Sequence, residues 1–361
     1  MNDGVSQQSG NTAHIAVAGG GMIGLACAFE LSRRGHNVTV FDPAGPRETT
    51  SWAAAGMIAP SFETMLHGGG PGTALARFCF DSARLWPEFA RAVRDASRLP
   101  TGYDPSPTLA LARTEEEAAR LEGLHAELLD AGHEARMVRL DTLRERVGVS
   151  SNLVAALELP RDTQVDNRKM LQALRLNRGK GKFGVERRAV ESFPELKAEG
   201  FDAVVWARGG REAGVVQKVK GQAIALQPIE GLPRQTLRFG SGYIVPKADR
   251  VVIGATSEED YIHTGVTGTA TARLLNAATA ILPALARAPV MEAWTGLRPK
   301  RAGGAPLIGE IAPGEFVASA HFRNGILLAP ATASCIADMV EGRPTQLDCS
   351  AFAPATTGFP A

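Results

Sequence analysis

Three glycines and one acid near the start of the chain have the spacing of a dinucleotide-binding turn. Gly19, Gly21 and Gly24 follow the pattern G-x-G-x-x-G, and Asp42 comes about 20 residues later. Gly19 would permit a tight turn, Gly21 would let the backbone approach a pyrophosphate, and Gly24 would let a helix pack closely on a strand. The carboxylate of Asp42 could accept hydrogen bonds from a ribose. Because a glycine-rich turn is usually only a turn, the flanking elements must support this assignment.

The elements around these glycines have the order of a βαβ unit. An apolar strand is predicted over 15–18, and a helix with an apolar face follows and ends at Gly35. A second strand is predicted over 37–41, directly before the acid. Met22 and Ile23 open the helix, whose N-terminus would present unpaired N–H groups and a positive dipole end to phosphates. The complete order predicts dinucleotide binding.

The composition excludes several classes of protein. The chain has 361 residues, 44% of them hydrophobic, which suffices for a full core and two domains. A net charge of +1 gives no reason to expect a nucleic-acid or membrane partner, and no apolar run is long enough to span a membrane. Residues 1–12 have neither a basic start nor an apolar core, so we expect a flexible tail there rather than a leader.

The cysteines do not form a recognisable metal-binding pattern. None stands in a C-x-x-C pair or at metal-ligand spacing with histidine; they are Cys27, Cys79, Cys335 and Cys349. We therefore expect no metal site, and a cytoplasmic protein with reduced thiols.

A run of small residues follows the second predicted strand. Thr49, Thr50 and Ser51 are good helix N-caps, so a helix start is one interpretation. The other is a backbone that lies flat against a large planar ligand, where bulky side chains would collide. The stretch 47–57, RETTSWAAAGM, resembles the flavin-contact segment of the glycine oxidase branch of the D-amino acid oxidase family. In that family the bound dinucleotide is FAD.

Later parts of the chain extend the resemblance over most of its length. The blocks 294–299, 303–309 and 320–332 are closely similar to glycine oxidases, including the thiamine-pathway enzyme. The stretch 175–214 is shorter and more charged than the family pattern, and its basic run is interpreted as a solvated loop.

The resemblance implies an α/β fold with two interleaved domains and a homo-oligomeric assembly. A Rossmann-like FAD-binding domain would comprise 13–80, 155–215 and 300–345. An α+β substrate-binding domain with an antiparallel sheet would comprise 81–154 and 216–299. Residues 1–12 and 346–361 would be flexible tails.

Helices are predicted over 73–97, 114–130 and 270–285, and strands over 109–112, 220–226 and within 241–260.

The resemblance also implies a set of cofactor contacts. The residues expected to contact FAD are Gly19, Gly21, Met22, Ile23, Gly24, Asp42, Thr49, Thr50, Ser51, Ala54, Ala55, Gly56, Met57, Val185, Arg298, Asn324, Gly325, Ile326 and Leu327. A helix opening near Ala331 and Thr332 would direct its positive end at the flavin.

Three side chains are expected to hold the substrate. Arg298 matches the family's principal carboxylate-binding arginine, Arg323 matches a second one, and Tyr243 matches a tyrosine whose hydroxyl helps to hold the substrate. An arginine suits a carboxylate because its planar fork bonds both oxygens and stays charged when buried. The alternatives are surface charges for the arginines and sheet packing for the tyrosine. His321 is interpreted as structural.

The implied reaction is oxidative deamination of glycine or a small amine. Hydride would pass from the substrate α carbon to flavin, the imine would hydrolyse to an oxo acid and ammonia, and oxygen would form hydrogen peroxide. No general base is needed if the amine enters neutral. Three alternatives remain: a D-amino acid or sarcosine-type oxidase or dehydrogenase with another electron acceptor, a non-catalytic flavoprotein-fold subunit, and a nicotinamide-dependent enzyme.

Overall fold

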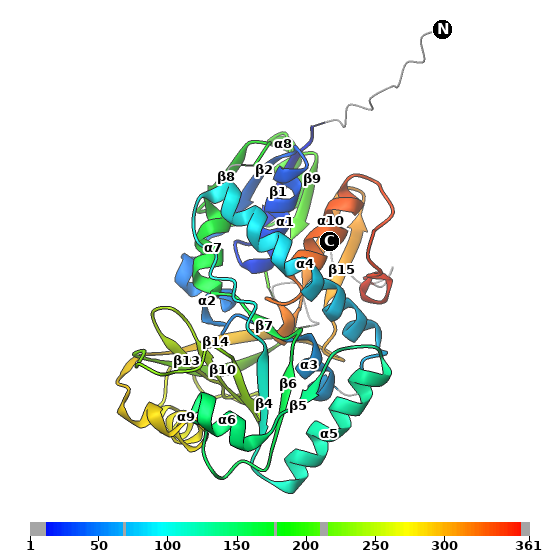
Figure 1. Ribbon diagram of the computed structural model, residues 1–361. Coiled ribbons are helices and arrows are strands. Elements are labelled where there is room, and N and C mark those ends of the chain that lie inside the picture. Colours follow the sequence, from blue (N-terminus) through cyan, green and yellow to red (C-terminus); the bar gives the residue numbers. More distant parts are fainter. Residues whose placement is uncertain (1–11, 68–69, 177–178, 210–215, 355–361) are drawn as a thin grey trace.

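The computed structural model describes residues 12–67, 70–176, 179–209 and 216–354. The tail expected over 1–12 therefore lies almost wholly outside the described residues, as do 355–361 of the second tail and parts of the weakly matching stretch 175–214. Two large sheets dominate the described part of the chain, one above the other in Figure 1. Within the described ranges no helix is both long and apolar enough to cross a bilayer, and no cluster of side chains there could hold a metal ion.

The first sheet is the upper one in Figure 1. Six strands of the described chain form it, in the order β15 (Leu307–Ala312), β16 (Glu315–Ser319), β9 (Ala203–Trp206), β1 (His14–Ala18), β2 (Asn37–Phe41) and β8 (Phe183–Glu186). Its strands pair in parallel, except that β15 and β16 form an antiparallel hairpin. The stretch 175–214 thus supplies two strands on opposite sides of β1 and β2, with the short helix α8 (Phe193–Ala198) between them.

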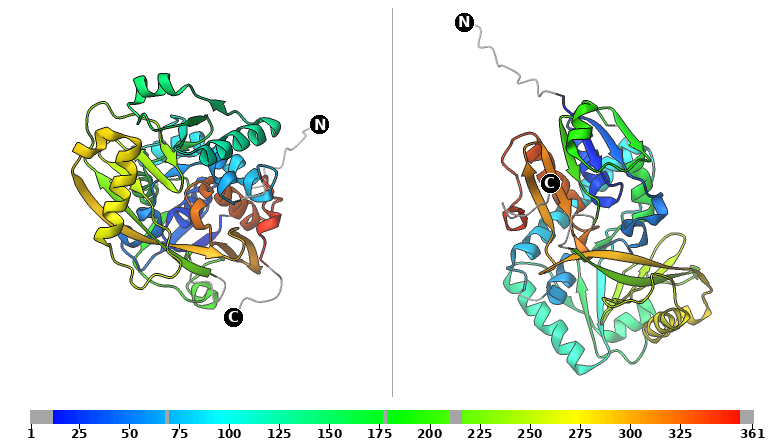
Figure 2. Two further views of the ribbon diagram at one scale, coloured as in Figure 1. Left: turned by 90° about the horizontal axis from the view of Figure 1, so that it is seen from below. Right: turned by 180° about the vertical axis from the view of Figure 1, so that it is seen from behind.

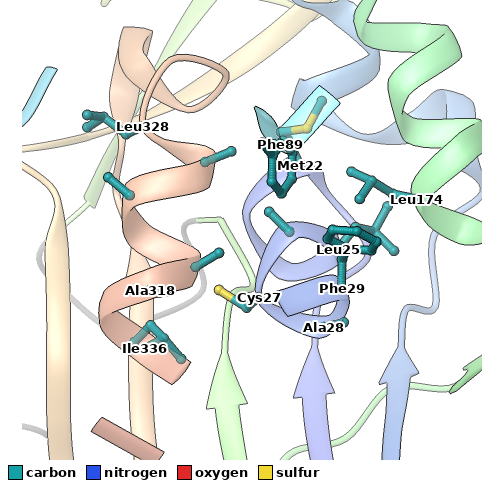
Figure 3. Packing of buried hydrophobic residues seen from close by; sticks show 14 of the residues in the cluster. Met22, Leu25, Cys27, Ala28, Phe29, Phe89, Leu174, Ala318, Leu328 and Ile336 are labelled. Carbon is teal, nitrogen blue, oxygen red and sulfur yellow. The ribbon is translucent and has the colours of Figure 1, made fainter. Parts of the chain in front are cut away.

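Apolar helices pack this sheet into a core. The βα turn leads into α1 (Met22–Arg33), which lies between α7 (Asn167–Arg175) and α10 (Ala329–Val340). Figure 3 shows Met22, Leu25 and Phe29 on one side of α1 near Phe89 and Leu174, and Cys27 on the side facing Ile336. Nearly all of α1 is buried because neighbours cover it on both sides, which explains its largely apolar sequence.

The second sheet is mainly antiparallel. Its eight described strands lie in the order β14 (Val290–Arg301), β10 (Val216–Leu226), β13 (Val251–Gly254), β12 (Gly242–Pro246), β11 (Leu237–Phe239), β4 (Thr108–Ala112), β6 (Ala155–Leu159) and β5 (Arg136–Met137). The helices α5 (Glu115–Asp130), α6 (Leu140–Val147) and α9 (Gly268–Ile281) lie around it, as the two further views in Figure 2 also show. The α-helix expected over 270–285 ends at Ile281, because Pro283 cannot donate a backbone hydrogen bond, and a 3-10 turn continues it.

A long helix and a short sheet complete the described fold. The long helix α4 (Ala74–Ser97) has the apolar stripe expected for it, and Ser82 and Trp86 donate hydrogen bonds to the carbonyl of Leu327, 2.7 and 2.9 Å long. The short sheet of β3 (Met57–Ile58) and β7 (Thr163–Gln164) lies between the two large sheets. Beyond residue 345, where a loose tail was expected, Phe352 is only 2% exposed and packs on Phe78. This segment packs on α4 because the aromatic ring of Phe352 buries a large apolar surface there.

Candidate active site

The first wall of the site is the turn between β1 and α1. A side chain at Gly19 or Gly24 would collide with the backbone. A Cβ on Gly19, whose φ is +116°, would lie 2.3 Å from the carbonyl oxygen of Ala207. A Cβ on Gly24 would lie 1.9 Å from the carbonyl oxygen of Gly19. Gly21 is the N-cap of α1 and adds no side chain at the start of that helix, where the N–H of Met22 donates to the hydroxyl of Ser51. The turn is therefore open to a phosphate.

Asp42 closes the same turn from the end of β2. Its Oδ2 atom accepts a hydrogen bond from the backbone N–H of Gly20 at 3.1 Å and forms an ion pair with Arg175 at 3.2 Å. Arg175 also donates to the Gly20 carbonyl at 2.9 Å. Gly20 and Arg175 were missed by the sequence analysis. Arg175 is the last residue of α7. Its side chain is not solvated as expected, because the Asp42 carboxylate and the Gly20 carbonyl hold it.

The second wall is the run of small residues after β2. Thr49 caps the one-turn helix α2 (Thr50–Ala53) by accepting from the N–H of Trp52. The first part of the run of small residues is therefore a helix start, as one interpretation predicted. Ser51 accepts from the N–H of Met22 at 2.8 Å, and Thr50 donates to the carbonyl of Leu297 at 2.8 Å. These bonds attach the run to both sheets, and its last residues present small side chains to the cavity.

One cavity joins these walls, with an empty volume of about 1620 Å³, part of it open to solvent. Seventeen of the predicted cofactor contacts line it: Gly19, Gly21, Met22, Ile23, Asp42, Thr49, Thr50, Ser51, Ala54, Ala55, Gly56, Met57, Arg298, Asn324, Gly325, Ile326 and Leu327.

 Gly24 does not line the cavity and packs behind the turn instead. Val185 does not line it either: it lies on the edge strand β8 and is 38% exposed.

The three predicted substrate contacts line the same cavity. Tyr243 comes from β12, Arg298 from β14 and Arg323 from the 3-10 turn Phe322–Asn324. The guanidinium of Arg298 lies over Gly221, where a Cβ would be 2.4 Å from its nitrogens, and it donates to the carbonyl of Thr256 at 3.2 Å. Gly221 was not predicted from the sequence, since nothing near it in the chain indicates that an arginine covers it.

Arg298 carries a positive charge on a partly buried side chain. Burial lowers its pKa from the ordinary value; the nearby Tyr243 raises it, Arg323 lowers it and Glu63 raises it. Among the described residues, no carboxylate lies within ion-pair distance of its guanidinium. Burial likewise raises the pKa of the Tyr243 hydroxyl, which therefore stays protonated near neutral pH. The cavity thus offers a cation and a hydroxyl to an anionic group.

The sequence analysis missed two charged residues next to Arg323: Glu63 and Arg238. Glu63, on α3 (Pro60–His67), lines the cavity and pairs with Arg323 at 3.4 Å. Its other oxygen lies 3.8 Å from Arg238, whose guanidinium stacks 3.9 Å from the ring centroid of Phe62. Burial lowers the pKa of Arg238 to about 10. In the sequence, Glu63 resembles any helix-surface carboxylate, so only its tertiary neighbours reveal this position.

His321 is buried beside the cavity and neutral. Its Nε2 atom lies 2.9 Å from the hydroxyl of Thr332, and burial lowers its pKa to about 3. This arrangement fits the structural role expected for it. The helix that follows, α10, begins at Ala329, slightly earlier than expected, and Thr332 lies within its first turn.

Comparison with known proteins gives a consistent result. Residues 14–339 match the family described as FAD dependent oxidoreductase (DAO). The chain is 30% identical to the glycine oxidase of Geobacillus kaustophilus over 94% of this chain and 95% of that protein. It is also 30% identical to the glycine oxidase of Pseudomonas aeruginosa, over 94% and 98% of the two chains.

A solved structure agrees with these sequence matches. The crystal structure of glycine oxidase from Geobacillus kaustophilus superposes with a TM-score of 0.83 at 28% identity, covering 95% of this chain and 98% of that one.

The bifunctional protein ThiO/ThiG of Nostoc is 31% identical over 91% of this chain, which spans 53% of that longer protein.

Proposed function

The chain belongs to the DAO family of FAD-dependent oxidoreductases, and we propose that it oxidises glycine or a similarly small amino acid. The enzyme class and the α/β fold predicted from the sequence are confirmed by the family match and by the glycine oxidase relatives. The identity of the substrate and the roles of the individual residues belong to the proposal.

The residues of the cavity fit FAD. The glycines add no side chains of their own at the N-terminus of α1, where a pyrophosphate would be stabilised by N–H groups and the helix dipole. Asp42 lies beside that turn and would face a ribose. Small side chains at Ala54, Ala55 and Gly56 leave a wall that a flat ring system can approach. When bound, FAD would accept a hydride from the α carbon of the substrate.

The observation that carries the proposal is the partly buried guanidinium of Arg298, which lines the cavity. A cation that is partly withdrawn from solvent, with no carboxylate partner among the described residues, is stabilised when a ligand supplies the negative charge. A substrate carboxylate would do so, and the fork of Arg298 would fix its orientation. The protonated hydroxyl of Tyr243 would donate to the same carboxylate, so that the α carbon points toward the flavin-contact wall. The amine would enter neutral and need no base.

The test is the visible flavin spectrum of the purified protein, kept free of oxygen, before and after glycine is added. Bleaching would support both substrate and reaction, and recovery in air with formation of hydrogen peroxide would support oxygen as the acceptor. A flavin band that glycine leaves unchanged would redirect the proposal to sarcosine or D-amino acids. A protein that cannot be loaded with FAD would contradict the proposal and favour a non-catalytic subunit.

Two predictions on the protein's setting stay part of this proposal. The four cysteines are buried free thiols, which fits the reducing cytoplasm. A homo-oligomer is expected from the family resemblance, and its mass in solution would test that expectation.

A further inference from the structure

The carboxylate of Glu63 is held at a defined position in the cavity wall. The N-terminus of α3 is capped by the buried Asp162, whose two oxygens accept from the N–H groups of Ser61 and Phe62 at 2.8 and 2.9 Å. Glu63 is the next residue along this helix, and it is itself buried. The cap fixes the first turn of α3, so Glu63 has little freedom to leave the wall.

Glu63 lies between two guanidiniums of different accessibility. Arg323 lines the cavity and pairs with Glu63 at 3.4 Å. Arg238 is fully buried on the other side, 3.8 Å from Glu63, with its Nη1 atom 3.4 Å from the sulfur of Met57. Glu63 therefore gives Arg323 a negative partner inside the protein, and Arg238 stabilises the charge of Glu63 from behind.

This arrangement leaves the cavity asymmetric in charge. Arg298 has no carboxylate partner among the described residues, whereas Arg323 already has one. A substrate with one carboxylate matches this pattern. A second carboxylate on the substrate would approach Arg323 against the charge of Glu63, because like charges in a poorly solvated site repel strongly.

We infer that Glu63 is a specificity-determining residue that neutralises Arg323 and restricts the site to amino acids with a single carboxylate. Without its charge, Arg323 would become a second anchor, and the site would accept a substrate with an acidic group at each end. This inference rests on the proposed function, since it assumes that Arg298 binds the first carboxylate. The competing explanation is a purely structural ion pair that orders the turn carrying Arg323.

The experiment replaces the charge while keeping the shape, with Glu63→Gln in the full-length, FAD-loaded protein. The values of kcat/KM are measured for glycine and for iminodiacetate. Iminodiacetate is glycine with a carboxymethyl group on its nitrogen, so it carries a second carboxylate. We expect the iminodiacetate-to-glycine ratio to rise about tenfold or more, the usual effect of one added charged hydrogen bond. Glu259→Gln removes the same charge from an exposed pair with Lys300 and should leave the ratio unchanged.

A binding measurement separates this inference from the proposed function. Acetate and glutarate, which are not oxidised, are titrated against the flavin spectrum of each variant. Glu63→Gln should tighten glutarate relative to acetate by a similar factor, whether or not glycine is turned over. Absence of turnover in the unaltered protein would contradict only the proposed function. An unchanged glutarate-to-acetate ratio would overturn the inference.

Two more variants establish the cause. In the double variant Glu63→Gln with Arg323→Gln, the gained affinity for glutarate should disappear. Arg323→Gln alone leaves Glu63 facing the cavity, so the glutarate-to-acetate ratio should fall below that of the unaltered protein. This single variant also tests the inference if Glu63→Gln does not fold. Equal losses for both ligands in these variants would support the structural explanation instead.

Discussion

The turn at Gly19 to Gly24 and the wall around Arg298 line one cavity, yet they are built by opposite means. The turn presents backbone N–H groups, and Gly19 and Gly24 are needed because a Cβ on either would lie within 2.3 Å of a backbone oxygen. The wall presents a hydroxyl from β12 and guanidiniums from β14 and the turn at Arg323, and partners far along the chain hold the two guanidiniums. This difference indicates that the first region is sensitive to added volume and the second to lost charge.

The largest effect is expected from Gly24→Ala. Its new methyl group would lie 1.9 Å from the Gly19 carbonyl, so the turn or the helix must move. We expect flavin affinity to fall at least about hundredfold, since overpacking of this kind costs several kcal/mol. Retained flavin absorbance after gel filtration is the measurement. Gly123→Ala, in α5 with no atom within 4 Å of the new Cβ, is the matched control and should keep its flavin.

Arg298→Ala should show the opposite pattern. It removes the carboxylate anchor and leaves the glycine turn intact, so flavin should stay bound. We expect kcat/KM for glycine to fall about hundredfold, mainly through KM, because a charge-assisted bidentate contact is lost. Steady-state kinetics with the flavin content of each preparation measure this. A variant that loses its yellow colour would show that Arg298 supports the cofactor instead.

Gly221→Ala tests whether added volume also matters on the substrate side. The methyl group would lie 2.4 Å from the guanidinium nitrogens of Arg298, which can move because they end a flexible side chain. We expect KM for glycine to rise about tenfold with flavin binding unchanged. An unchanged KM would mean that Arg298 does not need its observed position to bind substrate.

The smallest effect at neutral pH concerns His321, which lines the same cavity. Its pKa is lowered to about 3 by burial, so the unfolded chain binds a proton below about pH 6.5 that the folded protein does not. Its contribution to stability is thus complete above pH 6.5 and is lost as the pH falls toward 3. At pH 5 the loss is about 2 kcal/mol. Chemical unfolding at pH 7 and pH 5 should show this slope, and His321→Gln should reduce it.

The sequence analysis recovered the site unevenly. It identified the glycine turn and Asp42, because their spacing is local and each position follows from the geometry of one βαβ unit. It named Arg298, Arg323 and Tyr243 only through a family resemblance, and their roles remain proposals. It missed Glu63 and Arg238, which are separated by many residues and meet only in the folded chain. It also described Arg175 as solvated, whereas the residue contacts Asp42.

By itself, the sequence determined the dinucleotide-binding unit, the α/β class and the family, because hydrophobic periodicity and glycine spacing act over short stretches of chain. Only the tertiary structure decided which charges meet. Arg298 lies over Gly221 without a carboxylate partner in the described chain, whereas Glu63 is shared between Arg323 and Arg238. Charge pairing depends on distance and burial in three dimensions, and neither is written in the order of the residues.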